Sequence, residues 1–307
     1  MIIVGGTMDS MQLMVGTWYI VIAVFLSPAY FRIVYLFLTQ KKYRDLECYR
    51  IMTQIGFVQL TAAPTTFALG VMQLTDGDRF KIANFFMVIF SASMSVEIML
   101  SLVLAINRLK VIFDIEKLDP ISKVLNIFSW FYGFSYVVIV HTPLCGFYQL
   151  PGQYIGKYDF NKPYTWLLEK IDAYLLISCV CTTLLLYMTI IVYMAYLRSR
   201  SSNVARLTKE RSILIFAGVH FCFDMTLQVA FFFANLPPGD LSDLLVALVY
   251  FLNALLTAPV LYLLLTRSLR LDFVLIFVKL LRGPINTVSV VVSSSHVSSQ
   301  NVQSRYY

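Results

Sequence analysis

The chain has 307 residues, of which 59% are hydrophobic and only 13% are charged. Soluble domains usually contain about 25% charged and about 45–50% apolar residues, so this composition excludes a soluble globular fold. Five cysteines are too few for a disulfide scaffold, and the high apolar content excludes a disordered chain. The composition is typical of a protein whose solvent is the lipid bilayer.

Seven apolar stretches follow one another along the chain, and each is long enough to cross a hydrocarbon layer of about 30 Å. The predicted spans are residues 13–38, 51–73, 82–107, 124–147, 171–196, 213–236 and 243–265. The segments between them are too short to bury cores of their own. We therefore predict an all-α membrane protein in which residues 13–266 form a single seven-transmembrane helix bundle.

Lysine and arginine are distributed unequally between the two sides of the predicted bundle. Seventeen lie in the loops and tail on the side of the C-terminus, whereas five lie in the opposite loops. Cytoplasmic loops carry the excess of positive charge. This bias predicts a short extracellular N-terminus at residues 1–12 and a cytoplasmic C-terminus.

Two segments follow the seventh predicted span. Residues 267–282 are apolar but interrupted by charges, which predicts a short amphipathic helix at the cytoplasmic surface. Residues 283–307 are rich in serine and predict a disordered tail.

A few ionisable residues lie inside the predicted spans, where charge is costly and usually faces the protein interior. Glu97 precedes Arg108 by eleven residues, which places both on one face of the third helix. His220, Asp224 and Gln228 form a polar stripe on the sixth helix. These groups either line a ligand cavity or serve as structural contacts. In the second interpretation Glu97 is a hydrogen-bonded carboxylate, and Asp224 bonds to a group on the seventh helix.

The seventh predicted span contains Tyr250, Pro259 and Tyr262. Proline removes a backbone donor and permits a kink, so this helix is expected to have an irregular segment near Pro259. A kink with two possible bends could act as a switch, and a static kink is equally compatible with the sequence.

Three short motifs resemble those of nematode serpentine chemoreceptors of the Srt-like class. The third span ends LVLAINR (102–108), similar to the LAINR element of that family. The second opens CYRIM (48–52), which resembles its CYKIM start, and the seventh contains PVLY (259–262), which resembles its P-x-x-Y pattern. The resemblance extends over about residues 13–282. One expected feature is missing: residues 74–92 and 148–170 contain no cysteine, so a disulfide from the third helix to the second outer loop cannot form.

The resemblance implies a G-protein-coupled chemosensory receptor that binds an external small molecule or peptide and activates a heterotrimeric G protein. It also implies a plasma-membrane protein, of sensory neuron cilia for example, whose serine-rich tail recruits kinases and arrestin. Ligand binding is expected from Glu97, Asp224, Gln228, Phe231 and Tyr250. Coupling to the G protein and switching are expected from Asn107, Arg108, Lys110, Pro259 and Tyr262.

The alternative interpretation is a membrane transporter or a ligand-gated channel with seven helices. Transporters commonly contain repeated halves, and none is evident in the sequence. Seven-helix channels of the insect olfactory type have an internal N-terminus, which the charge bias opposes. Three histidines without metal-binding spacing argue against an enzyme or a metal site, and no cofactor or nucleic-acid partner is expected. A retinal protein is also disfavoured, since residues 243–265 contain no lysine for a Schiff base.

Overall fold

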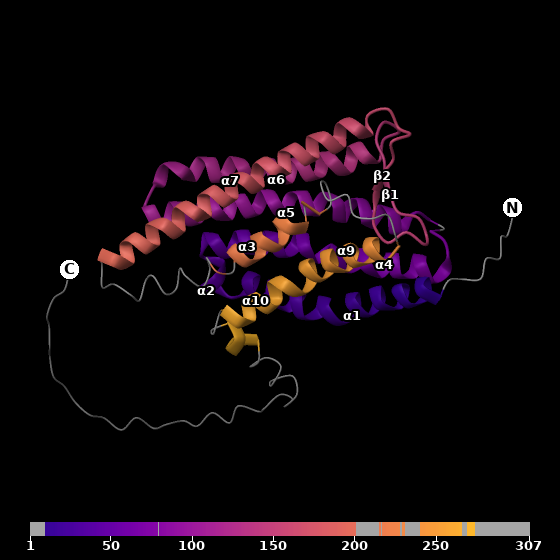
Figure 1. The fold of residues 1–307 in the computed structure, drawn as a ribbon. Helices are drawn as coiled ribbons and strands as arrows, with labels where there is room; N and C mark the ends of the chain where they lie inside the picture. The colour runs from indigo at the N-terminus through magenta and orange to yellow at the C-terminus, as the bar shows by residue number, and fades with distance from the viewer. Residues whose placement is uncertain are drawn as a thin grey trace, which may run out of the picture.

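The computed structural model describes residues 10–78, 80–200, 215, 217–227, 229–230, 240–265 and 269–273. These residues form a bundle of long helices with one small hairpin (Figure 1). In chain order the elements are α1 (Ser10–Thr39), α2 (Lys41–Arg44), α3 (Glu47–Leu60), α4 (Ala62–Thr75), α5 (Ile82–Phe113), η1 (Glu116–Leu118), α6 (Asp119–Val140), β1 (Phe147–Tyr148), β2 (Lys157–Tyr158), α7 (Thr165–Arg200), α9 (Asp240–Leu252), η2 (Asn253–Thr257) and α10 (Ala258–Leu265). Residues 217–227 are also helical and belong to the sixth predicted span.

Six helical segments in the described part of the chain are long and apolar enough to cross a membrane. They correspond to the first five and the seventh of the predicted spans. Several boundaries differ from the prediction. The first helix already begins at Ser10, inside the predicted N-terminal segment, and the fourth ends at Val140 rather than at residue 147. Hydropathy marks where lipid begins, whereas a helix ends where its backbone hydrogen bonds find other partners.

The second span consists of two helices, α3 and α4, which are separated at Thr61. Pro64 explains the break. Because proline has no backbone N–H, the carbonyl group of Leu60 loses its regular partner four residues later. At the break, the Thr61 hydroxyl and backbone nitrogen both donate to the carbonyl oxygen of Val58, three residues earlier.

α5 is the central helix of the bundle. Most of its apolar stretch is buried, whereas α6 and α7 bury less than a third of theirs. The exposed side chains on these outer helices are large and apolar, for example Ile127, Phe134 and Leu185. Such a surface matches a hydrocarbon solvent, and the helices satisfy their backbone hydrogen bonds internally.

At one end of the bundle, β1 and β2 form an antiparallel hairpin in which Phe147 pairs with Tyr158. The backbone N–H of Gln149 donates to the side-chain oxygen of Asn84 on α5 at 2.7 Å. All five cysteines lie among the described residues, and none forms a disulfide. Burial raises the pKa of the Cys145 thiol, which keeps it protonated and poorly reactive. The hairpin is therefore attached to α5 by hydrogen bonding instead of by the disulfide that the sequence had excluded.

The opposite end of the bundle is held by ion pairs. Lys110 at the end of α5 contacts Glu47 at 2.6 Å and Asp119 at 2.7 Å, which joins three spans. Lys42 on α2 pairs with Asp272, and this hydrogen bond raises the pKa of Lys42 above its usual value. Residues 269–273 are helical, and they are the only described part of the predicted amphipathic helix.

α1 and α4 approach each other closely at two glycines. A Cβ atom added at Gly70 would lie 2.8 Å from the carbonyl oxygen of Gly16, and one added at Gly16 would lie 2.9 Å from that of Gly70. Both distances are shorter than van der Waals contact. Small residues thus allow these two backbones to pack directly, as is common between membrane helices.

Replacing Gly70 tests this packing. We expect Gly70→Ala to lower the unfolding temperature of the purified protein in detergent, because overpacking typically costs about 1–3 kcal/mol. Gly218→Ala is the matched control, since a Cβ at that helical position meets nothing within 4 Å. Alanine favours a helix over glycine, so this control should unfold at the same temperature or higher. A Gly70→Ala protein as stable as the control would contradict the close approach.

Candidate functional site

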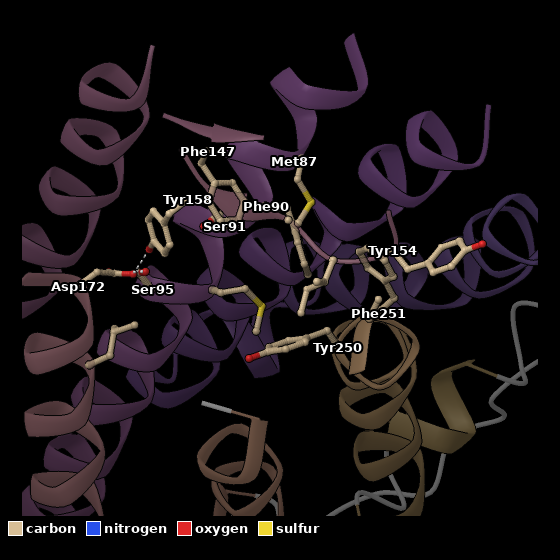
Figure 2. Close-up of a pocket in the computed structure, with 15 residues that line it drawn as sticks. Met87, Phe90, Ser91, Ser95, Phe147, Tyr154, Tyr158, Asp172, Tyr250 and Phe251 are labelled. Carbon is tan, nitrogen blue, oxygen red and sulfur yellow. Dashed lines mark hydrogen bonds between the residues drawn. The ribbon is translucent and has the colours of Figure 1, made fainter. Parts of the chain in front are cut away.

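A cavity of about 70 Å³ lies beneath the hairpin, among α5, α7 and α9 (Figure 2). A single buried water takes up about 10–15 Å³ of such space, so the cavity has room for a compact group of about five or six water volumes. Most of its walls are apolar or aromatic. The main lining residues are Met87, Phe90, Ser91, Met94, Ser95, Phe147, Tyr154, Tyr158, Asp172, Leu176, Ala247, Tyr250 and Phe251.

The hairpin closes over this cavity because Gly156 lets the chain come close to α5. A Cβ at Gly156 would lie 2.6 Å from the ring of Phe147 and 2.7 Å from the methyl group of Met87. Tyr154, two residues earlier, extends toward α1, where the Tyr19 hydroxyl donates to its carbonyl oxygen. The roof of the cavity is therefore packed against two helices.

Asp172 provides the one carboxylate in the lining. Its oxygens accept hydrogen bonds from the hydroxyl groups of Ser95 at 2.9 Å, Tyr132 at 2.7 Å and Tyr158 at 3.3 Å. Burial, together with nearby Tyr136 and Asp172, raises the pKa of Tyr158 well above its usual range, so its hydroxyl remains a donor. Asp172 thus joins α5, α6, β2 and α7 at one point.

All three donors to Asp172 are neutral. Its side chain is 3% exposed, and among the described residues no lysine or arginine pairs with it. A carboxylate that is buried without a cationic partner attracts positive charge or a strong hydrogen-bond donor. The cavity therefore has mostly apolar walls and one strong hydrogen-bond acceptor, the carboxylate of Asp172.

The lower side of the cavity in Figure 2 is formed by Tyr250 and Phe251 of α9. The Tyr250 hydroxyl donates to the carbonyl oxygen of Leu227 at 2.8 Å. The Phe251 ring lies 5.2 Å from that of Phe90 and 5.4 Å from that of Tyr19. α9 is therefore in contact with the sixth span, α5 and α1 at this level.

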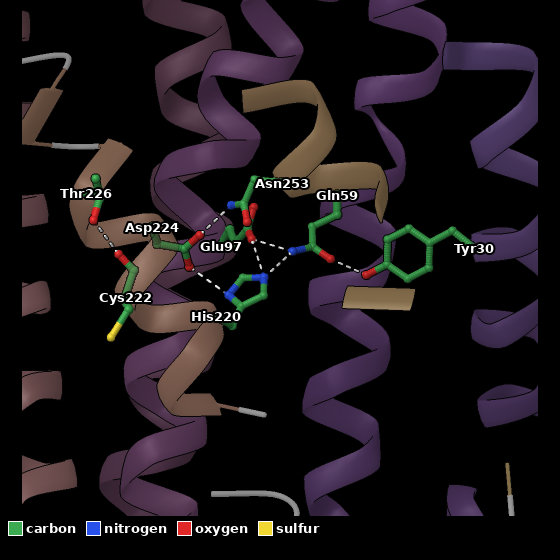
Figure 3. A network of polar contacts seen from close by, with 8 residues as sticks. All are labelled: Tyr30, Gln59, Glu97, His220, Cys222, Asp224, Thr226 and Asn253. Atoms are coloured by element: carbon green, nitrogen blue, oxygen red, sulfur yellow. Dashed lines mark hydrogen bonds and ion pairs between the residues drawn. The ribbon is translucent and has the colours of Figure 1, made fainter. Parts of the chain in front are cut away.

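A second polar site consists of side chains from five spans and extends through the middle of the bundle (Figure 3). Its members are buried polar groups in mutual contact: Tyr30, Gln59, Glu97, His220, Asp224 and Asn253. Hydrogen bonding begins with the Tyr30 hydroxyl, which donates to Gln59. The Gln59 amide nitrogen then lies 2.5 Å from Glu97 Oε1 and 2.6 Å from His220 Nε2.

The network continues along the sixth span to the seventh. His220 Nδ1 lies 2.8 Å from Asp224 Oδ2, and the Asn253 amide donates to Asp224 Oδ1 at 2.8 Å. The interpretation of Asp224 as a residue bonded to the seventh helix is thus confirmed. Two carboxylates share this network, and no lysine or arginine among the described residues pairs with either.

The expected ligand-binding residues occupy different places. Tyr250 lines the cavity, whereas Glu97 and Asp224 lie in the polar network and outside the cavity lining. Gln228 and Phe231 lie outside the described residues. Sequence reasoning missed Asp172 because this residue is the second of the predicted fifth span and so resembled an ordinary helix-end charge. The position of an acidic residue just inside the boundary of a predicted span was the one feature of the sequence that could have indicated this site.

The expected coupling and switch residues lie toward the other end of the bundle. Arg108 is buried, and its guanidinium donates to the side-chain oxygen of Asn107 at 3.4 Å. Lys110 is engaged in the ion pairs with α3 and α6 described above. Tyr262 is buried, with its ring 5.2 Å from that of Phe37. Pro259 lies two residues after the end of the π-helical turn η2, so the seventh helix is irregular near the proline, as expected.

No protein-family profile and no curated protein sequence matches this chain. Among solved structures, the crystal structure of squid rhodopsin is similar. The TM-score is 0.65, the two sequences are 14% identical, and the match covers 89% of this chain and 82% of the rhodopsin chain. The chain has a rhodopsin-like fold. At 14% identity the similarity shows a shared arrangement of helices and says nothing about the residues that line the cavity.

Removing the carboxylate of Asp172 should uncouple the elements that it joins. We expect Asp172→Leu to lower the unfolding temperature, because three buried hydroxyls lose an acceptor and each such loss costs about 1–3 kcal/mol. Tyr132→Phe should cost less in the Asp172→Leu background than in the wild type, with a coupling energy of about 0.5–3 kcal/mol. Thermal unfolding of the four proteins measures this cycle. Strictly additive effects would show that the two side chains do not interact.

Proposed function

We propose that the protein is a G-protein-coupled chemosensory receptor that binds an external small molecule in the cavity beneath the hairpin and activates a heterotrimeric G protein. The observation that carries this proposal is the combination of a rhodopsin-like fold with a mostly apolar cavity at the end of the bundle opposite the basic loops. The nematode-type motifs support the same proposal. In it, the hairpin end faces the outside, and the plasma membrane of sensory neuron cilia is the site of action.

The ligand in this proposal is small and mostly apolar. Space for about five or six water volumes suits a compact odorant-like molecule better than a peptide, which would need the hairpin to move away. Aromatic walls favour an apolar body. Asp172 favours one polar group that donates a hydrogen bond or carries positive charge.

The signal in this proposal reaches the cytoplasmic end through the polar network. Tyr250 lines the cavity, and Asn253 lies one helical turn further along the same helix and bonds to Asp224. A ligand that moves Tyr250 therefore also biases the contacts of Asn253, Asp224 and Gln59. Two arrangements of this network would correspond to the two states of the receptor. Kinases and arrestin would act on the serine-rich tail, which lies outside the described residues.

Filling the cavity tests where the ligand binds. We expect Ala247→Leu, at a buried lining position, to reduce the response to active compounds at least tenfold because its side chain occupies the space of the ligand. The assay is a screen of small volatile and amine compounds in cells that report second messengers, with surface expression measured in parallel. Ala195→Leu, at an exposed position on α7, is the matched control and should respond like the wild type. Equal dose–response curves for both variants would place the ligand elsewhere.

Arg108 tests the coupling step. In the proposed receptor this buried arginine lies at the cytoplasmic mouth of the bundle, so Arg108→Ala should abolish G-protein activation while ligand binding is retained. Second-messenger output and ligand binding are measured on the same cells. Wild-type signalling from Arg108→Ala would remove this residue from the mechanism.

A further inference from the structure

Three side chains in the polar network are of the kinds that bind metal ions. Glu97 of α5 and His220 and Asp224 of the sixth span each offer one ligand atom, and these atoms all lie within 4.8 Å of one another. The exposed fractions of the three residues are between 1% and 4%. We propose that this cluster binds a divalent transition-metal ion of the zinc class. This inference is independent of the proposed receptor function.

The geometry assigns separate roles within the cluster. Glu97 Oε1 and His220 Nε2 are 3.3 Å apart. Zinc bonds of about 2.0–2.2 Å in a tetrahedral site place two ligand atoms about 3.3–3.5 Å apart, so this pair already has the required spacing. Glu97 and His220 are therefore the direct ligands. An ion between them would join α5 to the sixth span and would replace the hydrogen bonds of the Gln59 amide nitrogen to these two atoms.

Asp224 has the position of an orienting carboxylate. Its Oδ2 atom lies 2.8 Å from His220 Nδ1, the ring nitrogen opposite to the one that faces Glu97. The contact has the length of an ion pair and not the alignment of a hydrogen bond. A carboxylate at this distance favours a proton on Nδ1, and the lone pair of Nε2 is then directed toward Glu97 and Gln59. Metal-binding histidines are commonly held in this way by a carboxylate on the second nitrogen.

Two independent features of the network favour a bound cation. The two carboxylates lie within the membrane-spanning part of the bundle, and no described lysine or arginine pairs with either, so a divalent ion would compensate their charge. The Oδ1 atom of Asn253 is buried and accepts no hydrogen bond among the described residues, although the same amide donates to Asp224. An oxygen donor without a partner thus lies beside the cluster. Because one ligand is imidazole, zinc, cobalt, nickel and copper are favoured over sodium or calcium.

The test uses the full-length protein, purified in detergent and treated with a chelator. Cobalt(II) is the spectroscopic probe, and zinc is the competitor. We expect one cobalt ion per chain with visible absorption that zinc abolishes, and an unfolding temperature that rises by several degrees with zinc but not with sodium or calcium. No cobalt absorption and no zinc-dependent shift in the wild type would overturn the proposal. Equal stabilisation by sodium or calcium would also overturn it.

Variants distinguish ligands from the orienting residue. Glu97→Gln and His220→Asn should lose the zinc effect, whereas Asp224→Asn should retain it with about 10–100-fold weaker affinity. His141→Asn is the control, because this histidine is exposed and its ring bonds to the backbone of the helix that precedes it. Retained zinc affinity in both ligand variants would overturn the assignment.

A second measurement does not depend on how the variants fold. X-ray absorption at the zinc edge of the wild-type protein should show one imidazole and otherwise oxygen ligands. Sulfur ligands, or an ion without imidazole, would place the metal elsewhere and overturn the proposed site.

Discussion

A polar group inside a bilayer has no water to bond, so it must find its partner within the protein. This constraint explains the contact between five spans at the middle of the bundle. Gln59 links α1 to α5, because its side chain contacts Tyr30 on α1 and Glu97 on α5. The same side chain also contacts His220 on the sixth span. Asp224 extends the contact to Asn253 on the seventh. Moving any one of these helices would leave a buried polar group without a hydrogen-bond partner. The network therefore couples the positions of the five spans.

The hairpin end of the molecule follows the same rule with different groups. The hairpin lacks a disulfide, and side chains from the helices below satisfy its backbone instead. Asn84 accepts from the backbone of Gln149, and Gln73 both donates to the carbonyl oxygen of Gln153 and accepts from the N–H of Gly152. Hydrogen bonds of this kind are weaker than a covalent bridge and can be exchanged. The roof of the cavity is thus held in place by hydrogen bonds from α4 and α5.

The cavity and the network are neighbours because the seventh helix takes part in both. Tyr250 lines the cavity, Asn253 belongs to the network, and the π-helical turn η2 begins at Asn253 itself. π-Helical turns are frequent at functional sites because an extra residue in the turn strains the regular hydrogen bonding. In the proposed receptor, this irregular segment is the place where the seventh helix would change shape.

The sequence by itself determined the membrane class, the approximate positions of six spans, the imbalance of basic residues and the lack of a disulfide at the hairpin end. These properties depend on local composition, because the hydropathy and charge of each segment determine whether it enters the bilayer. It also indicated a bond from Asp224 to the seventh helix. Only the tertiary structure decided that Gln59 meets His220, that Glu97 belongs to the network instead of the cavity, and that Asp172 gathers three hydroxyls. Those contacts join residues that lie far apart in the chain, and they depend on how each helix is rotated and kinked, which no local pattern specifies.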